Sequence, residues 1–245
     1  GKPLHRNDIS RIGYMPEERG LYRKMKVGEQ ITYFASLKGL SKDQVKEAVR
    51  YWFHTFGIEE WWNKKVEELS KGMQQKVQFI TTVIHRPEIL ILDEPFSGFD
   101  PVNAEMIKEE LLKLKKGGTT IILSTHRMES VEALCDHIAL INKSKVVLEG
   151  PIKEVRQRFK NNTFELLIQN NSETPPTLET GGFHVLTSEK MAEGHWHLFI
   201  NAERGIDTNK LLQLAMQHGH IALFREILPD VNEIFIQLVK GQSDE

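Results

Sequence analysis

The sequence predicts an α/β fold built on a parallel sheet, followed by a small α+β domain. The segment ILILD at residues 89–93 is a continuous apolar run, typical of a central parallel strand that helices cover on both faces. The segment TTIILS at 119–124 predicts a second, β-branched strand. Near residue 159 the pattern changes, because short strand-like segments and Pro- or Gly-rich loops become frequent.

Apolar residues at helical spacing predict helices within residues 28–62. Ser41 is a suitable N-cap, because Gln44 stands three residues later, at the spacing of a capping box. Trp52 and Phe56 follow on the apolar side of this predicted helix. We therefore expect them to lie in the core.

A further helix is predicted to begin within the segment LSKGMQQ at residues 69–75. Ser70 is a natural N-cap, and Gly72 allows a close approach to the backbone. Lys71 places a positive charge between them. Because the free amides at a helix start bind phosphate well, this segment is a candidate phosphate-binding loop.

Asp100 and Pro101 predict the start of another helix, which runs to about Lys116. The strand that follows it ends close to His126. A neutral imidazole there is able to hydrogen-bond a phosphate or a water, although such a histidine is by itself more often a helix cap or a core residue.

Asp93 and Glu94 end the first predicted strand, and function is expected at the carboxyl ends of parallel strands. Consecutive strand residues point to opposite faces, so the two carboxylates should have different tasks. One would hold a magnesium ion, directly or through water, and the other would face the attacking water. The pair alone does not exclude a strand that simply ends in solvated acids.

Composition limits the classes of protein that the chain can belong to. With 245 residues, of which 40% are hydrophobic, it is long enough for a good core and for two domains. A net charge of −2 argues against nucleic acid as a partner, and no apolar run approaches the roughly 18 residues of a membrane span. The single cysteine, Cys135, forms no internal disulfide, and we expect it to pack as a small apolar residue.

Charge divides unevenly along the chain. Residues 160–245 carry six Lys and Arg against twelve Asp and Glu, a charge of −6, which leaves +4 for residues 1–159. We predict two domains, 1–158 and 159–245.

The second domain is predicted to follow a hairpin over 138–150 and a helix over 152–159. Its expected strands are FELLIQN, FHVLT, HWHLFIN and IALFREI, and its expected helices are Asp207–Gln217 and Asp230–Lys240. Five of the ten histidines lie here, His195 and His197 on one face of a strand. A metal site is conceivable, but no cysteine or well-spaced carboxylate completes a ligand set, so we favour solvated or hydrogen-bonded histidines.

Taken in order, LSKGMQQ, ILILDEP, SGFD and the histidine that follows TTIILST resemble the ATP-binding subunit of ABC transporters. The resemblance covers about the first 155 residues. It implies an ABC-type ATPase core with a parallel sheet and a helical subdomain. Ser70 and Gly72 resemble the signature loop, which reaches across a dimer to the γ-phosphate on the other subunit.

The same resemblance implies roles for the strand-end residues. Asp93 is similar to the Walker B aspartate that serves the metal, Glu94 to the general base, and His126 to the switch histidine. Asp100 is similar to the aspartate of the dimer-spanning D-loop. ATP and magnesium are the expected cofactors.

Several positions depart from the commonest family pattern. Lys71 stands where a second glycine is usual, Met73 where a glutamine is usual, and Phe99 in place of a leucine. In IGYMPEERGLY, Glu17 occupies the position of the glutamine that couples to the metal, and a carboxylate is also able to ligate magnesium. Glu17 and Glu18 are alternatively only solvated loop acids. With LSKGMQQKVQ, this variant resembles the sodium-exporter branch of the family.

The sequence contains no G-x-x-x-x-G-K-S/T phosphate-binding loop. Its first residues, GKPLHRND, resemble the hairpin that follows the strand, loop and helix of that unit. The resemblance thus implies an amino-terminally truncated ATPase, and we expect the printed chain alone to bind ATP weakly and to be inactive. The alternative is a non-enzymatic regulatory module that has lost the loop.

The resemblance also implies partners and a location. The intact protein is expected to form a homodimer of ATPase domains and to power export, of sodium or a small molecule, through a separate transmembrane permease subunit. It would be cytoplasmic, at the inner face of the plasma membrane. Trp61 and Trp62 would line the groove that receives the permease, or pack internally, which is the commoner role of such aromatics.

Overall fold

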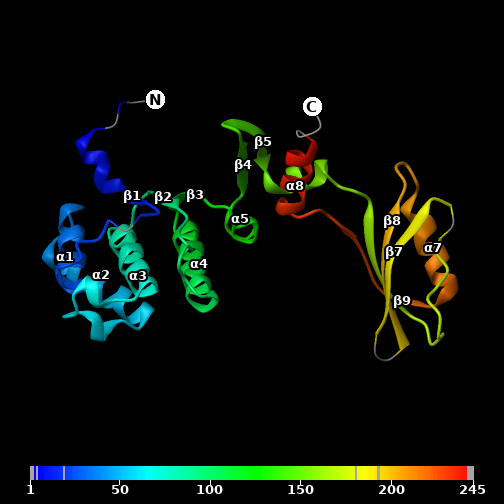
Figure 1. Cartoon of the computed structure of the whole chain (residues 1–245), viewed down its shortest axis with the longest axis horizontal. Helices are drawn as coiled ribbons and strands as arrows, with labels where there is room; N and C mark the ends of the chain where they lie inside the picture. The colour runs from blue at the N-terminus through cyan, green and yellow to red at the C-terminus, as the bar shows by residue number, and fades with distance from the viewer. Residues whose placement is uncertain (1–2, 4, 19, 180, 192–193, 242–245) are drawn as a thin grey trace. The chain divides into compact units, whose positions relative to one another are not determined.

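The chain divides into two compact units, residues 1–135 and 136–245. The computed structural model describes residues 3, 5–18, 20–179, 181–191 and 194–241. Among the described residues, no helix is both long and apolar enough to cross a bilayer. Figure 1 shows the elements of both units in order along the chain.

The first unit combines one small sheet with several helices. Its strands are β1 (Ile12–Met15), β2 (Ile89–Asp93) and β3 (Thr120–Ser124). Its α-helices are α1 (Val27–Leu37), α2 (Lys42–Phe56), α3 (Lys71–Val83), α4 (Pro101–Lys116) and α5 (Met128–Leu134). Short 3₁₀ helices are η1 (Arg6–Arg11), η2 (Glu59–Trp61) and η3 (Val66–Glu68).

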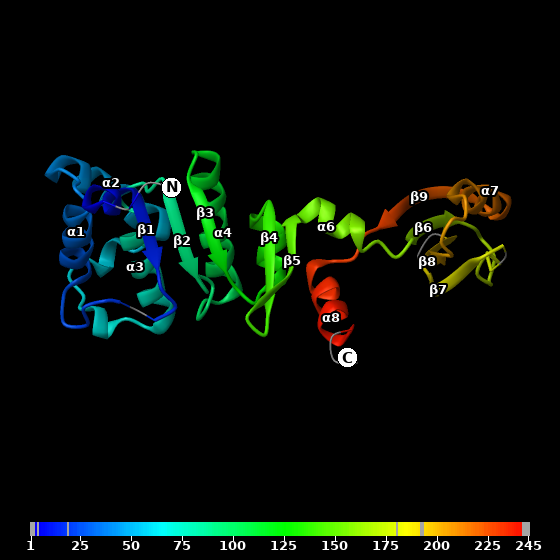
Figure 2. The ribbon, with the colours of Figure 1, turned by 90° about the horizontal axis from the view of Figure 1, so that it is seen from above.

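The sheet of the first unit is parallel, with the strand order β1-β2-β3, as the sequence predicts. Figure 2 shows the three strands side by side and pointing the same way. Met15, Leu90 and Leu92 are fully buried on one face, in the same apolar cluster as residues of α3 and α4. Both helices lie on the same side of the sheet in Figure 1. The helices α3 and α4 therefore cover this face and pack against the strands close to their ends.

The other face of the sheet contradicts the prediction of helices on both sides. Tyr14 and Ile122, which flank Ile91 in the strand register, are 58% and 56% exposed. Side chains alternate between the two faces of a strand, so the helices that bury Leu90 and Leu92 leave Ile91 only half-buried. The continuous apolar run identifies the central strand correctly, but it does not show that both faces are covered among the described residues.

The helix starts agree with the predicted caps. Ser41 Oγ accepts a hydrogen bond from Gln44 N while the Gln44 side chain accepts one from Ser41 N, forming the expected capping box. Trp52 and Phe56 are buried in the core. Cys135 packs against the same apolar cluster.

The two neighbouring tryptophans behave differently. Trp61 is partly buried against the core of the first unit. Trp62 remains 42% exposed, although its ring lies tilted against Phe53, with 5.6 Å between the ring centroids, and so close to Gly28 that a Cβ there would overlap it. Internal packing therefore accounts for Trp61 and for one side of Trp62.

The second unit begins with a hairpin of β4 (His137–Asn142) and β5 (Lys145–Pro151), then α6 (Ile152–Arg158). A four-stranded antiparallel sheet follows, in the order β7-β8-β6-β9. Its strands are β6 (Thr163–Gln169), β7 (Phe183–Lys190), β8 (His195–Ala202) and β9 (His220–Ile227). The remaining helices are α7 (Thr208–His218) and α8 (Val231–Gly241). This matches the α+β prediction strand for strand.

One face of the antiparallel sheet carries the core of the second unit. Leu166, Leu198 and Ile200 are fully buried in one cluster with Leu211 and Ala215 of α7. The carboxyl-terminal segment is held separately, because the Arg156 guanidinium of α6 donates to the carbonyl oxygens of residues 228 and 229, just before α8. The predicted boundary at 158/159 stays a prediction.

Candidate functional site

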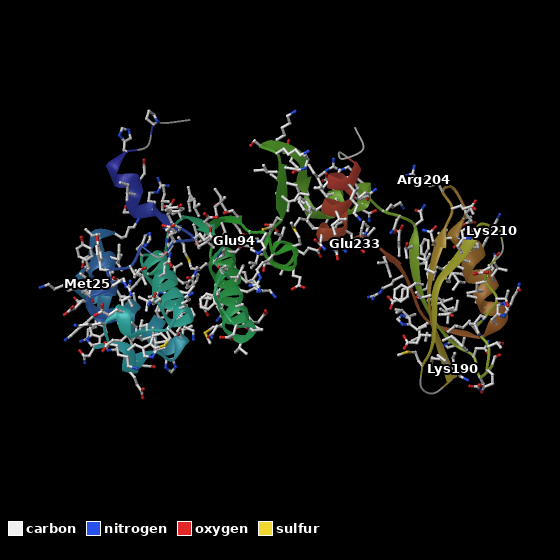
Figure 3. All side chains as sticks on the ribbon, in the orientation of Figure 1. Met25, Glu94, Lys190, Arg204, Lys210 and Glu233 are labelled. Atoms are coloured by element: carbon white, nitrogen blue, oxygen red, sulfur yellow. The ribbon has the colours of Figure 1, made fainter. Side chains whose placement is uncertain are left out.

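The three parallel strands end at one edge of the sheet and bring three loops together there. Met15 pairs with Leu92, and Asp93 pairs with Ser124. Glu17, Glu94 and His126 therefore follow neighbouring strand ends, although they are far apart in sequence. Figure 3 marks Glu94 at this edge. The carboxyl edge is where open parallel sheets place their ligands.

Glu94 is the most constrained of these residues. Its Oε1 accepts hydrogen bonds from the His126 backbone N and lies 2.8 Å from His126 Nδ1, and its Oε2 accepts from Thr125 Oγ1 at 3.1 Å. Its backbone φ is +45°, a left-handed conformation that costs a residue with a side chain about 1 kcal/mol or more. The loop therefore holds this carboxylate in one place.

The turn after β3 also holds itself in shape. The Thr125 hydroxyl, which donates to Glu94, accepts from the Arg127 backbone N at 3.1 Å. The Arg127 guanidinium donates to the Phe96 carbonyl at 3.3 Å. The loops after β2 and β3 are thereby joined by both backbone and side-chain bonds.

Asp93 lies beside Glu94 but on a separate set of contacts. Its Oδ1 accepts a 2.6 Å hydrogen bond from Ser124 Oγ, the residue opposite it on β3. The side chain is half-buried, and its second oxygen has no partner among the described residues. One carboxylate oxygen is thus oriented while the other remains available to a ligand.

Glu17 occupies the adjoining loop after β1 and is exposed. Gln78 of α3 holds this loop, because its Nε2 donates to the Pro16 carbonyl at 2.8 Å and to the Glu18 carbonyl at 3.4 Å. Within the described part of the chain, no hydrogen bond joins Glu17 to Asp93 or Glu94. The structure places Glu17 at the same edge without bringing it into contact with the other two carboxylates.

Ser70, Lys71 and Gly72 begin α3, as the sequence predicts. Ser70 is the N-cap and accepts from Met73 N at 3.3 Å, while Lys71 is exposed. A Cβ added at Gly72 would lie 3.5 Å from the Gly98 carbonyl. The start of α3 is therefore close to the SGFD loop of the same subunit.

Asp100 closes that loop as the N-cap of α4. Its Oδ1 accepts from the Asn103 backbone N at 3.0 Å, and its Oδ2 accepts from the Asn103 side chain. These bonds, the backbone one first, lower the pKa of Asp100. Phe99, which stands in place of the family's usual leucine, packs partly against the core of its own unit.

Sequence reasoning missed the residues that support the site. Ser124 and Thr125 orient Asp93 and Glu94, and Gln78 secures the loop that carries Glu17. The signal for Ser124 is available in the sequence, since ILILD and TIILS align end to end as neighbouring parallel strands. Nothing local identifies Gln78, whose contacts lie about 60 residues away.

The residues at this edge fit a magnesium nucleotide. Magnesium usually keeps several waters and takes one or two protein carboxylates together with substrate phosphates, so a full protein cage is not required. Among the described residues, no cluster of three or more His, Cys, Asp or Glu is arranged to hold a metal by itself. Asp93, with one oxygen oriented and one available, matches the smaller requirement.

Comparison with known proteins also indicates a nucleotide-binding protein. The ABC transporter family model matches residues 3–97, and the model of the carboxyl-terminal domain of DrrA1-3-like ATP-binding proteins matches 150–239. An uncharacterised ABC transporter ATP-binding protein of Alkalihalophilus pseudofirmus, BpOF4_11395, is 38% identical over 98% of this chain and 87% of its own length. The chain belongs to the family of ABC transporter ATP-binding proteins.

Two further relatives have a shorter match. The uncharacterised ABC transporter ATP-binding protein YhaQ of Bacillus subtilis is 52% identical over 65% of this chain, a match that spans 53% of its own length. A solved ATP-binding subunit of an ABC transporter is 29% identical, with a TM-score of 0.58, over 61% of this chain and 62% of that one. The chain thus spans about half the length of YhaQ, and most of the length of the Alkalihalophilus relative.

Proposed function

We propose that this chain acts as an ATP-binding and ATP-hydrolysing subunit that powers export through a separate transmembrane permease. The observation that carries the proposal is the fixed carboxylate of Glu94 at the carboxyl edge of the sheet, bonded to His126 and Thr125 and next to Asp93. Solvated acids at a strand end would have no need of a left-handed backbone and three hydrogen bonds.

Each residue at the edge has a task that its contacts support. Glu94 would take a proton from the attacking water at a carboxylate oxygen, and general bases of this kind contribute roughly 10²–10⁴-fold to rate. His126, which touches Glu94 Oε1, would hold the carboxylate and would hydrogen-bond the phosphate. Asp93 and, by loop position, Glu17 would hold magnesium, which supplies charge neutralisation at the phosphates when bound.

The start of α3 would act on the second subunit of a homodimer. Ser70, Lys71 and Gly72 offer a helix start, a positive charge and little side-chain bulk, which suit a phosphate. Asp100 follows Gly98, whose carbonyl lies beside Gly72 at this helix start. Asp100 would therefore take part in the contact between the two subunits. Support comes from the exposure of Ser70 and Lys71, since a surface that works across a dimer must be accessible in one subunit.

Export of sodium or of a small molecule, at the inner face of the plasma membrane, completes the proposal. It rests on the family and on the variant EERGLY and LSKGMQQKVQ segments. The substrate is the finer part of the proposal, and reconstitution with a candidate transmembrane permease would test it by sodium efflux.

Hydrolysis is tested with residues 1–245 joined, before Gly1, to a strand, G-x-x-x-x-G-K-S/T loop and helix. We expect magnesium-dependent turnover, which Glu94→Gln abolishes while ATP binding and an ATP-bound dimer persist. Glu165→Gln, which changes a glutamate–histidine pair in the second unit, is the matched control and should leave turnover unchanged. Normal turnover in Glu94→Gln would refute the assigned base.

The same protein tests the dimer. Ser70→Arg puts a bulky side chain at the helix start, so ATP-dependent dimers should disappear from gel filtration while the monomer stays folded. Lys42→Arg, at the exposed start of α2, is the control. Printed residues 1–245 alone should show weak magnesium-ATP binding by calorimetry, and micromolar binding with turnover would exclude the truncated-ATPase expectation.

A further inference from the structure

We propose that the second unit contains a binding cleft for a phosphate-bearing ligand, separate from the carboxyl edge described above. The cleft lies between the end of α6, the link from α6 to β6 and the loop from β8 to α7, and has a volume of about 570 Å³. An adjoining hollow of about 460 Å³ has much of the same lining. Both volumes fall in the range of small-molecule sites.

Positive charge gathers in this cleft although the unit is acidic. Residues 136–245 carry eleven Lys and Arg against fifteen Asp and Glu. Three of those cations line both hollows: Arg158 and Lys160, from the end of α6 and the link after it, and Arg204, from the loop after β8. Against the two carboxylates of the lining, Glu203 and Glu226, these three cations leave the cleft with a net positive charge, which favours an anion.

The two carboxylates of the cleft are already engaged. Glu226 accepts from Lys160 Nζ at 3.2 Å, and Glu203 lies 3.2 Å from His184 Nε2. The charge of Glu226 is therefore partly offset by Lys160 before any ligand enters. Glu226 also takes one N–H donor of Lys160 away from a ligand. Removing the charge of Glu226 should therefore strengthen binding of an anion.

Arg204 is the strongest donor available to a ligand. It is exposed, and it has no hydrogen bond or ion pair within the part of the chain that the structure describes. The Arg158 guanidinium donates one N–H to the Glu149 carbonyl, at 3.1 Å, and its other N–H groups are available to a ligand. Guanidinium groups bind phosphate through paired N–H donors, which a carboxylate or phosphate oxygen pair matches.

Neutral groups complete the cleft. Asn162 and Thr208 add side-chain hydrogen-bonding groups, and the buried Phe164 and Ala202 form an apolar floor. A phosphate with a small organic part meets both kinds of surface. Soluble phosphate esters and lipid headgroups share this chemistry, so the experiment has to distinguish the two.

Binding is measured on residues 1–245 with two kinds of probe. Calorimetric titration uses inorganic phosphate and glycerol 3-phosphate, and sedimentation uses vesicles of phosphatidylcholine with or without an equal amount of phosphatidylglycerol. We expect a dissociation constant below about 1 mM for a soluble probe, or binding to the phosphatidylglycerol vesicles alone. The first result identifies a soluble ester, and the second a lipid headgroup.

Three variants assign that binding to the cleft. Arg204→Ala should weaken it at least about tenfold, because a charged, bidentate donor is lost. Glu226→Gln should strengthen it, because the change removes a negative charge and frees Lys160. Lys190→Ala is the control. It removes one positive charge from β7, beside the start of β8, whereas Arg204 follows the end of β8; Figure 3 labels both residues.

The proposal is overturned by either of two results. One is that neither soluble probe nor phosphatidylglycerol vesicles bind the wild-type chain. The other is that Arg204→Ala and Lys190→Ala bind alike, which would place the anion elsewhere, including at the edge of the first unit. Circular dichroism of each variant shows that loss of binding is not loss of folding.

Discussion

Two glutamate–histidine pairs, one in each unit, have the same separation and different surroundings. Glu94 Oε1 lies 2.8 Å from His126 Nδ1, and Glu165 Oε1 lies 2.8 Å from His197 Nε2. The His126 side chain is 83% exposed and that of His197 is 24% exposed. Glu165 is also bonded to Arg225 and sits within the regular β6 strand, whereas Glu94 lies in a left-handed turn.

The difference shows that a short glutamate–histidine bond does not by itself mark a reactive site. Glu165 is 8% exposed and has a partner for each oxygen, so its bonds compensate for burial. Glu94 is 15% exposed next to a histidine open to solvent, at a strand end where a ligand has access. Backbone strain and position at the sheet edge distinguish Glu94, the proposed base, from Glu165.

The largest expected effect is on stability. Glu165→Ala leaves the largely buried His197 without its acceptor and should lower the free energy of unfolding by about 1–3 kcal/mol. Glu94→Ala should lower it by about 1 kcal/mol or less, since water replaces the carboxylate at the exposed His126. Denaturant unfolding followed by fluorescence measures both. Equal losses would mean that the two pairs are energetically alike.

A third histidine extends the comparison to pH. His85 Nε2 donates to the Ile12 carbonyl at 3.2 Å, and its Nδ1 is buried without a partner among the described residues. Burial, and next the charge of Lys38, lower the pKa of His85 from 6.5 to about 4. Between these pH values the unfolded chain binds more protons, so the stability of the first unit should fall as pH drops through this window.

The loss should reach about 2 kcal/mol, after a discount for the solvent that reaches this half-buried ring. Unfolding is followed in Trp196→Phe, so that only tryptophans of the first unit report. His85→Gln keeps a donor but does not titrate, and should flatten the pH dependence. An unchanged slope in that variant would remove His85 as the cause.

The second unit should respond only at lower pH. Burial acts to raise the pKa of Glu165, but the hydrogen bonds from His197 and Arg225 outweigh it, and the net pKa lies below the ordinary 4.5. The stability that this carboxylate contributes is therefore present above pH 4.5 and is lost as pH falls through the lower, folded value. Fluorescence of Trp196 alone would separate this transition from that of the first unit.

A smaller effect concerns how Glu94 is held. Thr125→Val removes the hydrogen bond to Oε2 at nearly constant volume, so turnover of the protein joined to a G-x-x-x-x-G-K-S/T unit should fall about tenfold, or about 1.4 kcal/mol. ATP affinity should change little, because the Thr125 hydroxyl donates to Glu94, the proposed base. Thr125→Ser keeps the hydroxyl and should restore most of the rate, which would assign the loss to the hydroxyl and not to the methyl group.

The smallest effect compares glycine with alanine at both glutamates. At position 94, where φ is +45°, Glu94→Gly should be more stable than Glu94→Ala by about 1 kcal/mol. At position 165, within a strand, Glu165→Gly should be less stable than Glu165→Ala by a similar amount. Opposite signs in unfolding experiments would confirm that only the first backbone is strained.

The sequence by itself determined most of the helices and strands of this protein, and the starts of several helices. Ser41, Ser70 and Asp100 cap helices through residues three positions away, and such contacts are fixed by local spacing. ILILD and TIILS specify strands by their own composition, and the order of motifs was sufficient to indicate the ABC transporter family. Local physics was enough for all of these.

Only the tertiary structure decided which residues meet. Glu94 reaches Thr125 and His126 across about 30 residues, and Gln78 holds the Glu17 loop across about 60, contacts that exist only once the parallel strands have taken their register. The same register left Tyr14 and Ile122 exposed beside an apolar run that suggested burial on both faces. In the second unit, packing brings Arg204 into one cleft with Arg158 and Lys160, which are remote from it in the sequence, because packing, and not spacing, sets distances between remote segments.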